Sequence, residues 1–172
     1  MMIRRYHPQD LNQIAKLFYE TVHTINIRDY SQKQVDVWAS GKIDFKDWNR
    51  SFLQHYSIVV ENNGMIAGFG DFDAANSYID RLYVHKDCQG QGIGTQICNM
   101  LEKQALGSSI TVHASITARP FFEMRGYKMI KEQQVDREGI LLTNFVMKKY
   151  CQTDSPFWQK AIKTEEYKEI RL

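Results

Sequence analysis

The sequence predicts a mixed fold of helices and strands, α/β in the broad sense and α+β in detail, in which helices flank a central mixed, mostly antiparallel sheet. Three observations predict it. Apolar residues recur at helical spacing as far as residue 52, and short β-branched runs joined by tight turns follow from residue 57. A glycine-rich turn after residue 88 then separates a strong strand pattern from a strong helix pattern.

Length and composition fit one domain of ordinary size. The chain has 172 residues, 43% of them apolar, so it can bury a core without a metal or a disulfide. Charged residues make up 24%, and a net charge of +2 is too balanced for a protein that coats nucleic acid. Three cysteines without metal-ligand spacing indicate reduced thiols. With no signal-peptide pattern and no long apolar run, we expect a cytoplasmic protein without nucleic-acid or membrane partners.

The amino-terminal part predicts one strand and three helices. The strand spans 2–6, and the first helix has apolar residues three and four positions apart: Leu11, Ile14, Leu17, Phe18, Val22 and Ile25. Ser31 is an N-cap residue type and begins a second helix, with Val35 and Trp38 on one face. A third, short helix spans 44–52.

Residues 57–84 predict three strands in succession. The first two, 57–61 and 65–73, are joined by Asn63-Gly64, a strong hairpin signal. The third spans 77–84 and leads into the glycine-rich turn. Short links between neighbouring strands favour antiparallel pairing.

The remaining elements follow the glycine-rich turn. Apolar residues at spacings of four, seven and eight predict a helix: Ile93, Ile97, Met100 and Leu101. Next come a strand, a helix with Gly126 as its C-cap, and a closing hairpin, at 109–114, 117–125, 127–135 and 140–149. We therefore expect one domain over residues 1–150. The pattern of residues 151–172 predicts a helical extension that packs either on this domain or on a second subunit. A homodimer is therefore one of the two alternatives.

The glycine-rich turn has the chemistry of a diphosphate site. Diphosphate needs several backbone N–H groups in one concavity at the positive end of a helix, and glycines let the backbone approach the oxygens. Gly90, Gly92 and Gly94 lie in this context. The turn follows a hairpin in mid-chain, without GxGxxG spacing and without a Gly-Lys-Ser/Thr sequence, so it fits neither a Rossmann dinucleotide site nor a Walker loop.

The run Cys88-Gln89-Gly90-Gln91-Gly92-Ile93-Gly94 resembles the acetyl-CoA-binding motif of the GNAT acetyltransferase superfamily, whose core is Gln/Arg-x-x-Gly-x-Gly/Ala. Gln89, Gly92 and Gly94 fill its fixed positions. The order of predicted elements over residues 1–150 is similar as well. The resemblance implies a GNAT-type acyl-CoA N-acyltransferase fold with acetyl-CoA as cosubstrate and no metal.

The resemblance also implies which residues contact acetyl-CoA. Backbone amides of the turn and of the helix start hold the pyrophosphate, the preceding strand pairs with the pantetheine arm, and the region after the fifth strand lies beside it. An amide of that preceding strand polarises the thioester carbonyl. The implied residues are Leu82, Tyr83, Val84, Gln89, Gly90, Gln91, Gly92, Ile93, Gly94, Thr95, Ser115, Ala118, Phe121 and Phe122.

The second half of the motif region departs from the family pattern. Ser115 stands where many members have an Asn, and Phe122 stands where many have the Tyr that protonates the departing thiolate. Phe122 cannot donate a proton. A water, Tyr83 or Tyr127 remains open as the acid, and a thiol with a pKa of about 8.5 is a tolerable leaving group without one.

The acceptor amine requires a base, since a lysine-like amine has a pKa of about 10.4. Asp80 is the first candidate, because it lies between apolar neighbours in a central strand. Asp71, Asp73 and a water chain are alternatives, and His113, at the end of the fifth strand, ranks below Asp80.

Strand alternation sorts the residues around Asp80 into two faces. It predicts one face with Tyr78, Asp80, Leu82 and Val84, and another with Ile79, Arg81 and Tyr83. For the acceptor itself we expect contacts from Tyr30, Trp38 and Asp71.

These features predict an N-acetyltransferase that moves an acetyl group from acetyl-CoA to a primary amine of a small molecule or peptide. Direct attack is favoured, because no cysteine or serine has a recognisable activating pair. The alternative is a non-catalytic acyl-CoA-binding or sensing module, which Phe122 keeps open. A nucleotide-phosphate-binding protein unrelated to CoA is a third interpretation, in which ATP or NAD would compete with acetyl-CoA.

Overall fold

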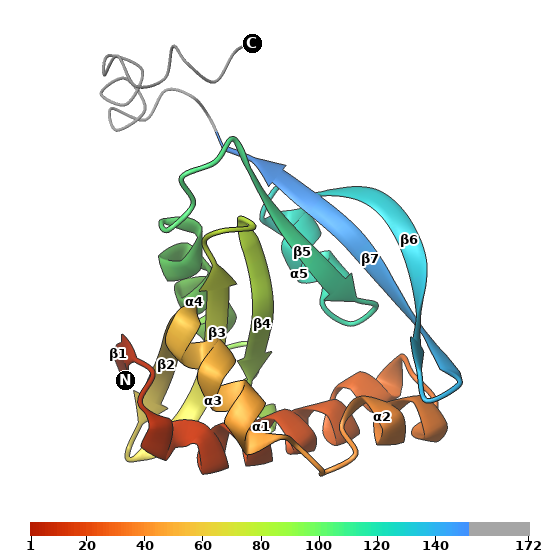
Figure 1. Cartoon of the computed structure of the whole chain (residues 1–172), viewed down its shortest axis with the longest axis horizontal. Helices are drawn as coiled ribbons and strands as arrows, with labels where there is room; N and C mark the ends of the chain where they lie inside the picture. Colours follow the sequence, from red (N-terminus) through yellow and green to blue (C-terminus); the bar gives the residue numbers. More distant parts are fainter. Residues whose placement is uncertain (152–172) are drawn as a thin grey trace.

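The computed structural model describes residues 1–151, so all but the first residue of the predicted extension 151–172 lies outside the described residues. The described chain folds around one seven-stranded sheet with the order β1-β2-β3-β4-β5-β7-β6 (Figure 1). Its strands are β1 Met2–Arg5, β2 Tyr56–Asn62, β3 Met65–Asp73, β4 Tyr78–Val84, β5 Ser109–Ser115, β6 Lys128–Arg137 and β7 Ile140–Tyr150. The predicted fold class is confirmed.

All neighbouring strands are antiparallel except β4 and β5. These two run parallel and pair at only two positions, Tyr78 with Thr111 and Ile79 with Val112. Beyond them the strands diverge, because β5 continues along β7 while β4 continues along β3. The sheet is therefore open between β4 and β5, with one unpaired strand edge on each side.

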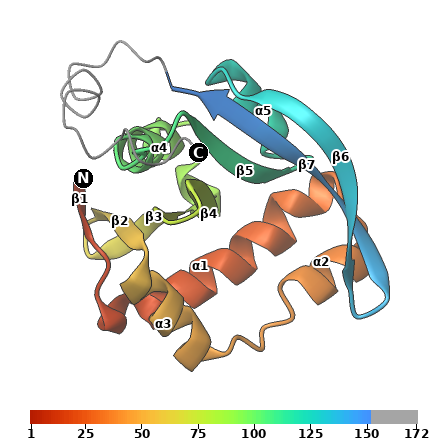
Figure 2. The same cartoon turned by 45° about the horizontal axis from the view of Figure 1, so that its top comes forward.

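Helices cover both faces of the sheet (Figure 2). On one face lie α1 Leu11–Thr24, α2 Gln32–Trp38 and α3 Phe45–Gln54, and on the other lie α4 Ile93–Glu102 and α5 Arg119–Met124. Two apolar clusters result. The α1 side buries Ile14, Leu17, Val59 and Phe69, whereas the α4 side buries Phe72, Ile79, Ile97 and Leu101. Side chains on the two faces of the sheet thus pack into two separate layers of the hydrophobic core.

Local signals explain the element boundaries. Ser31 accepts a hydrogen bond from the Gln34 N–H, and the Gln34 side chain accepts from the Ser31 N–H, which forms the capping box of α2. Asn63 and Gly64 both have positive φ, as the tight turn between β2 and β3 requires. Among the described residues, no helix is long and apolar enough to cross a bilayer.

The predicted faces of β4 are wrong on one side of Asp80. The pairing of β3 with β4 shifts between Asp71 and Phe72, which face Arg81 and Ile79, so Asp80 is an unpaired bulge residue. Ile79 consequently belongs to the same cluster as Leu82, not to the cluster of Tyr83. Asp80 and Arg81 come together on the α3 side, where their charged groups lie 3.0 Å apart. A bulge changes which side chains share a face of the strand, and the pattern of residues in the sequence did not predict this bulge.

Candidate functional site

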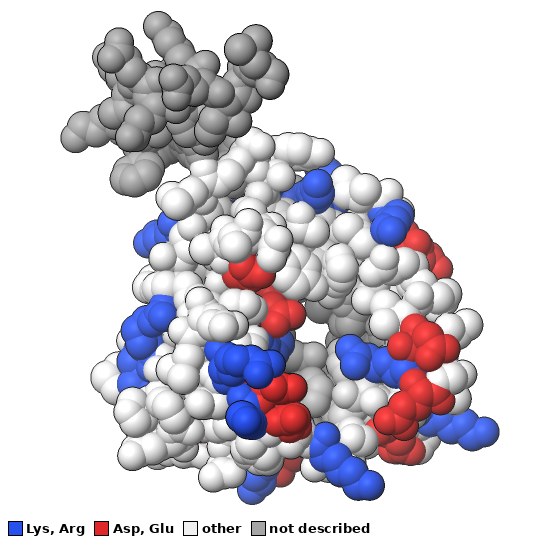
Figure 3. Space-filling view, viewed as in Figure 1, with Lys and Arg blue, Asp and Glu red and all other residues white. Residues whose placement is uncertain are grey.

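A cavity of about 460 Å³ lies where β4 and β5 diverge. Its walls come from β4, the glycine-rich turn, the start of α4, the end of β5, α5 and the end of α1. In the space-filling view the molecule is hollowed between the part that holds α3, β3 and β4 and the arch of β6 and β7, with both acidic and basic side chains around the hollow (Figure 3). This is the place that an open α/β sheet offers to a ligand.

The glycine-rich turn forms one end of the cavity. Gly90 and Gly92 have φ of 72° and 76°, and Gly92 is the N-cap of α4 with no side-chain cap. In the described structure, the backbone N–H groups of residues 89–95 donate to no other group of the chain. A short, uncapped helix start with several free N–H groups favours a polyanion.

The glycines of the turn differ in what surrounds them. A Cβ added at Gly90 or Gly92 would meet nothing within 4 Å. The positive φ therefore favours glycine at both positions, and both glycines line the cavity. Gly94 is different, since its Cβ would lie 3.6 Å from the Phe121 ring, an ordinary contact.

The open edge of β4 forms the middle of the cavity. His85 donates its N–H to Ala67 of β3, so the backbone groups of Val84 and Leu82 point to the opposite, β5 side. The Val84 carbonyl there accepts hydrogen bonds from the Thr21 hydroxyl at 3.1 Å and from the Gln89 amide at 2.7 Å. These bonds join α1, β4 and the glycine-rich turn at the unpaired edge.

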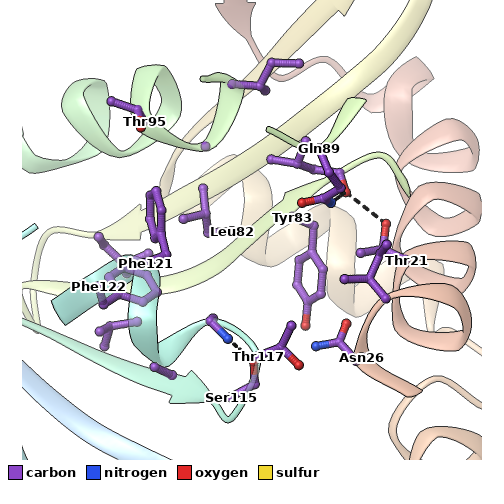
Figure 4. Close-up of a pocket in the computed structure, with 18 of the residues that line it drawn as sticks. Thr21, Asn26, Leu82, Tyr83, Gln89, Thr95, Ser115, Thr117, Phe121 and Phe122 are labelled. Carbon is purple, nitrogen blue, oxygen red and sulfur yellow. Dashed lines mark hydrogen bonds between the residues drawn. The ribbon is translucent and has the colours of Figure 1, made fainter. Parts of the chain in front are cut away.

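The β5–α5 region forms the opposite wall. The Ser115 hydroxyl accepts a hydrogen bond from the Ala118 N–H at 3.1 Å, which fixes the turn into α5 (Figure 4). Phe122 is 2% exposed and packs edge-on against Phe121 and Tyr127. It has no hydroxyl to offer to the cavity, as the sequence indicated.

Thirteen of the fourteen residues expected to contact the cosubstrate line this cavity, namely Leu82, Tyr83, Val84, Gln89, Gly90, Gly92, Ile93, Gly94, Thr95, Ser115, Ala118, Phe121 and Phe122. Gln91 is not among the lining residues, because its side chain turns away and donates to the Asp87 carbonyl at 3.4 Å.

Tyr83 lines the cavity from the side opposite the α4 core. Its ring stacks on Phe69 and meets Phe18 edge-on. In Figure 4 the ring points into the cavity, with its hydroxyl toward Asn26 and Thr117. Burial raises the pKa of the Tyr83 phenol, so the group stays protonated near neutral pH.

Asp80 and His113 lie at the point where the strands diverge, and both line the cavity. The Asp80 side chain is 38% exposed, and burial of the rest raises its pKa, against the opposing effect of Arg81. His113 packs edge-on against the Tyr78 ring, and burial lowers its pKa. A carboxylate with a raised pKa and a neutral imidazole are both suitable proton acceptors.

Of the residues expected to contact the acceptor, only Trp38 lines the cavity. Tyr30 is buried outside it, where its hydroxyl donates to the Thr143 carbonyl at 2.6 Å and accepts from the Ile116 N–H at 2.9 Å. Asp71 is fully buried between His55 and Arg81. Neither side chain lines the cavity, and each is engaged in hydrogen bonds with other groups of the chain.

Tyr127 is also outside the cavity lining. It is 1% exposed, and its hydroxyl lies 3.2 Å from Glu102 on the α4 side. Burial raises the pKa of this phenol. The structure therefore removes Tyr127 from the possible proton donors.

Sequence reasoning missed several lining residues: Thr21, Ile25, Cys88 and Thr117. One signal was available, because Thr21 places a hydroxyl within the apolar spacing of α1, and the structure shows that this residue is buried. The others come from loops and short turns, where periodicity carries no information.

One group of possible metal ligands lies beside the cavity. A ring nitrogen of His55 and carboxylate oxygens of Asp71 and Asp80 lie within 4.8 Å of one another. The Arg81 guanidinium already pairs with both carboxylates, at 2.9 Å and 3.0 Å. The Arg81 guanidinium thus supplies a positive charge to the two carboxylates of this group.

Comparison with known proteins gives a consistent result. A sequence model described as an acetyltransferase (GNAT) domain matches residues 26–149. The chain is 33% identical over 148 residues to the uncharacterized N-acetyltransferase YafP of Escherichia coli strain K12, covering 86% of this chain and 95% of that protein.

Two solved structures have the same fold. A GCN5-related N-acetyltransferase from Rhodopseudomonas palustris superposes with a TM-score of 0.82 at 31% identity, covering 87% of this chain and 95% of the other. The PaiA N-acetyltransferase from Thermoplasma acidophilum, solved in complex with coenzyme A, gives a TM-score of 0.69 at 14% identity, covering 87% and 98%.

Proposed function

The chain belongs to the GNAT acetyltransferase family, and from that premise we propose that it moves an acetyl group from acetyl-CoA directly to a primary amine of a small molecule or peptide. We further propose that residues 1–150 form the catalytic domain and that the protein acts in the cytoplasm. Its acetyl-CoA supplies an activated thioester, and the following roles belong to the chain's own residues.

One observation carries the proposal. The free N–H groups of residues 89–95 open into a cavity that continues between two unpaired strand edges. A diphosphate fits the first part, and an extended arm with amide groups fits the second, since it can pair with a strand edge. CoA has both parts in this order, and the similar structure from Thermoplasma acidophilum was solved with coenzyme A.

We assign the strand-edge roles to Leu82 and Val84. Their backbone groups face the open side, and Thr21 and Gln89 hold the Val84 carbonyl in place. An N–H of this edge, directed at a thioester oxygen, would stabilise the negative charge that develops there.

Tyr83 is the proposed proton donor to the departing thiolate. It is the tyrosine whose hydroxyl reaches the cavity in Figure 4, whereas Phe122 has none and Tyr127 is turned away. Its raised pKa keeps the proton available over the working pH range.

Asp80 is the proposed base for the acceptor. It lines the cavity where the strands part, and its carboxylate has a raised pKa because of burial. His113 is the second candidate, on the facing strand. Asn26, Trp38 and Thr117 border the same side and are proposed to contact the acceptor.

A non-catalytic acyl-CoA-binding module is the second candidate function, and the buried Phe122 is the observation that favours it. It shares the cosubstrate site with the first proposal and differs in turnover.

The test combines calorimetry with an activity screen. Acetyl-CoA binding is measured directly, and CoA release is followed across a panel of small-molecule amines, polyamines and peptides with a free amine. Binding with turnover on at least one amine supports the transferase. Tight binding without turnover on any amine would support the binding module instead. Strong competition by ATP or NAD would contradict a CoA site.

A further inference from the structure

A histidine–aspartate pair lies directly behind Asp80. His55 ends α3 and precedes β2, and its Nδ1 lies 2.6 Å from Oδ2 of Asp71. Asp71 has no solvent exposure, and Arg81 also donates to both of its oxygens, at 3.0 Å and 2.9 Å. A buried, doubly engaged carboxylate of this kind fixes the ring of its histidine partner.

The pairing determines which ring nitrogen is available. An ionised carboxylate only accepts, so the Nδ1 of His55 carries the proton that Asp71 binds, and Nε2 of the neutral ring keeps a free lone pair. The Nε2 atom lies 4.0 Å from Oδ2 of Asp73, near the surface. The His55 side chain is 18% exposed. The ring thus connects a buried carboxylate with solvent.

The bulge in β4 brings Asp80 to this pair. A carboxylate oxygen of Asp80 and a ring nitrogen of His55 lie within 4.8 Å, a separation that one water bridges. Asp80 lines the cavity, whereas His55 does not. His55 therefore lies between the cavity carboxylate and the outer surface.

We propose that His55, oriented by Asp71, relays the acceptor's proton from Asp80 to solvent. The acceptor ammonium gives a proton to the Asp80 carboxylate, which leaves a neutral amine and a carboxylic acid. The acid passes that proton through one bridging water to Nε2 of His55, which restores the carboxylate and forms an imidazolium. The imidazolium then releases the proton to water, so the pair is ready for the next cycle.

The charged surroundings suit a group that changes protonation in use. Asp71 and Asp73 face the ring from β3 and Asp80 from β4. Arg81 pairs with Asp71 and Asp80, and Arg5 of β1 donates to the His55 carbonyl. The hydrogen bond with Asp71 raises the pKa of His55. The neutral, accepting form is consequently lost as the pH falls through that raised pKa.

The relay rests on the proposed acetyl transfer, and kinetics test it once an acceptor is known. His55→Gln keeps a hydrogen-bond donor for Asp71 but cannot carry a proton. His23→Gln is the matched control, since His23 is also 18% exposed beside a carboxylate, that of Asp36, and lies outside the cavity lining. We expect kcat to fall about tenfold or more in His55→Gln with KM for acetyl-CoA unchanged, a part of what a positioned acid or base contributes.

Two readouts separate a relay from a structural role. Added imidazole should restore kcat of His55→Gln and leave the wild type unaffected, and the acid limb of the kcat–pH profile should move in this variant alone. A kcat, pH profile and imidazole response equal to those of His23→Gln would overturn the relay while the transferase stands.

A third readout needs no turnover. The His55 ring is titrated by NMR in the wild type and in Asp80→Asn, and removal of the neighbouring carboxylate should lower the pKa of His55. An unchanged titration would overturn the relay. Absence of turnover by the wild type on every amine would overturn the proposed function, and the relay with it.

Discussion

The Thr21 hydroxyl donates a hydrogen bond of 3.1 Å to the carbonyl of Val84, at the end of the strand that borders the candidate CoA cavity. Thr21 is 5% exposed and lies on the face of α1 that packs on the sheet. The bond links the helix on one side of the sheet to the last residue of β4. It therefore holds the unpaired edge of β4 in position, and the proposed pairing with pantetheine depends on that edge.

Replacing Thr21 by Val removes this bond and keeps the side-chain shape. We expect weaker acetyl-CoA binding by about 1 kcal/mol, the usual contribution of one hydrogen bond, which is roughly fivefold in Kd. Thr24→Val is the control, because Thr24 is exposed at the end of the same helix and carries the same change in helix propensity. Equal Kd values for the two variants in calorimetry would contradict the role of Thr21.

Gly92 and Gly64 form a matched pair for testing the glycine-rich turn. Both have φ of 76°, and at neither would an added Cβ meet an atom within 4 Å. Alanine should destabilise the fold by about 1 kcal/mol at either position, because the left-handed region disfavours a Cβ. Only Gly92→Ala should also raise the Kd of acetyl-CoA, by tenfold or more, since its methyl group enters the proposed diphosphate cradle. Urea unfolding measures the stability of both variants, and calorimetry measures their Kd for acetyl-CoA. An equal Kd for both variants would contradict the proposed diphosphate cradle.

Much of the fold could be predicted from local patterns. Helical spacing in α1, the Asn63-Gly64 turn and the Ser31 capping box each depend on residues close together in the sequence, and the structure has all three. The glycine-rich turn was recognisable for the same reason. These features were local enough to be visible in one sequence.

The acceptor side could not be predicted in this way. The bulge at Asp80 depends on how β3 and β4 pair, and it moved Ile79 to the other face. His55 contacts Asp71 only because α3 and β3 meet in the fold, so nothing in the sequence near His55 suggested a role. Asp71 and Tyr30 were expected at the acceptor and instead hold other groups in place. Long-range pairing determines such contacts.

Tyr83→Phe tests the proposed proton donor. The variant keeps the ring contacts with Phe69 and Phe18 and loses only the hydroxyl. We expect kcat to fall about 10- to 100-fold, at the low end for a general acid because a thiolate leaves readily, with Kd for acetyl-CoA unchanged. Tyr56→Phe, outside the cavity lining, serves as the control. Since burial raises the pKa of Tyr83, wild-type kcat should show no alkaline decline from this group below about pH 10. An unaltered kcat would contradict the role of Tyr83 and would mean that water protonates the departing thiolate.

Glu102 provides a prediction about stability and its pH dependence. Its carboxylate, 14% exposed, lies between Lys149 at 2.8 Å and Arg125 at 3.0 Å under the end of α4. Burial alone would raise the pKa of Glu102, but the hydrogen bonds from Arg125 and Lys149 outweigh it and lower the pKa below its ordinary value. A lowered pKa in the folded state means that the ionised carboxylate stabilises the fold above the unfolded pKa and that this contribution is lost as the pH falls.

Glu102→Gln should therefore lower the free energy of unfolding by about 2 kcal/mol at pH 7, less than a fully buried pair would lose because some solvent contact remains. The difference from wild type should shrink as the pH falls below about 4.3, where unfolded glutamate becomes protonated. Glu123→Gln is the control, since Glu123 is 44% exposed in its pair with Arg119, and surface pairs contribute about 0–1 kcal/mol. Urea unfolding of the three proteins at several pH values measures this. A difference that stays constant with pH would mean that Glu102 stabilises the fold by packing and not by charge.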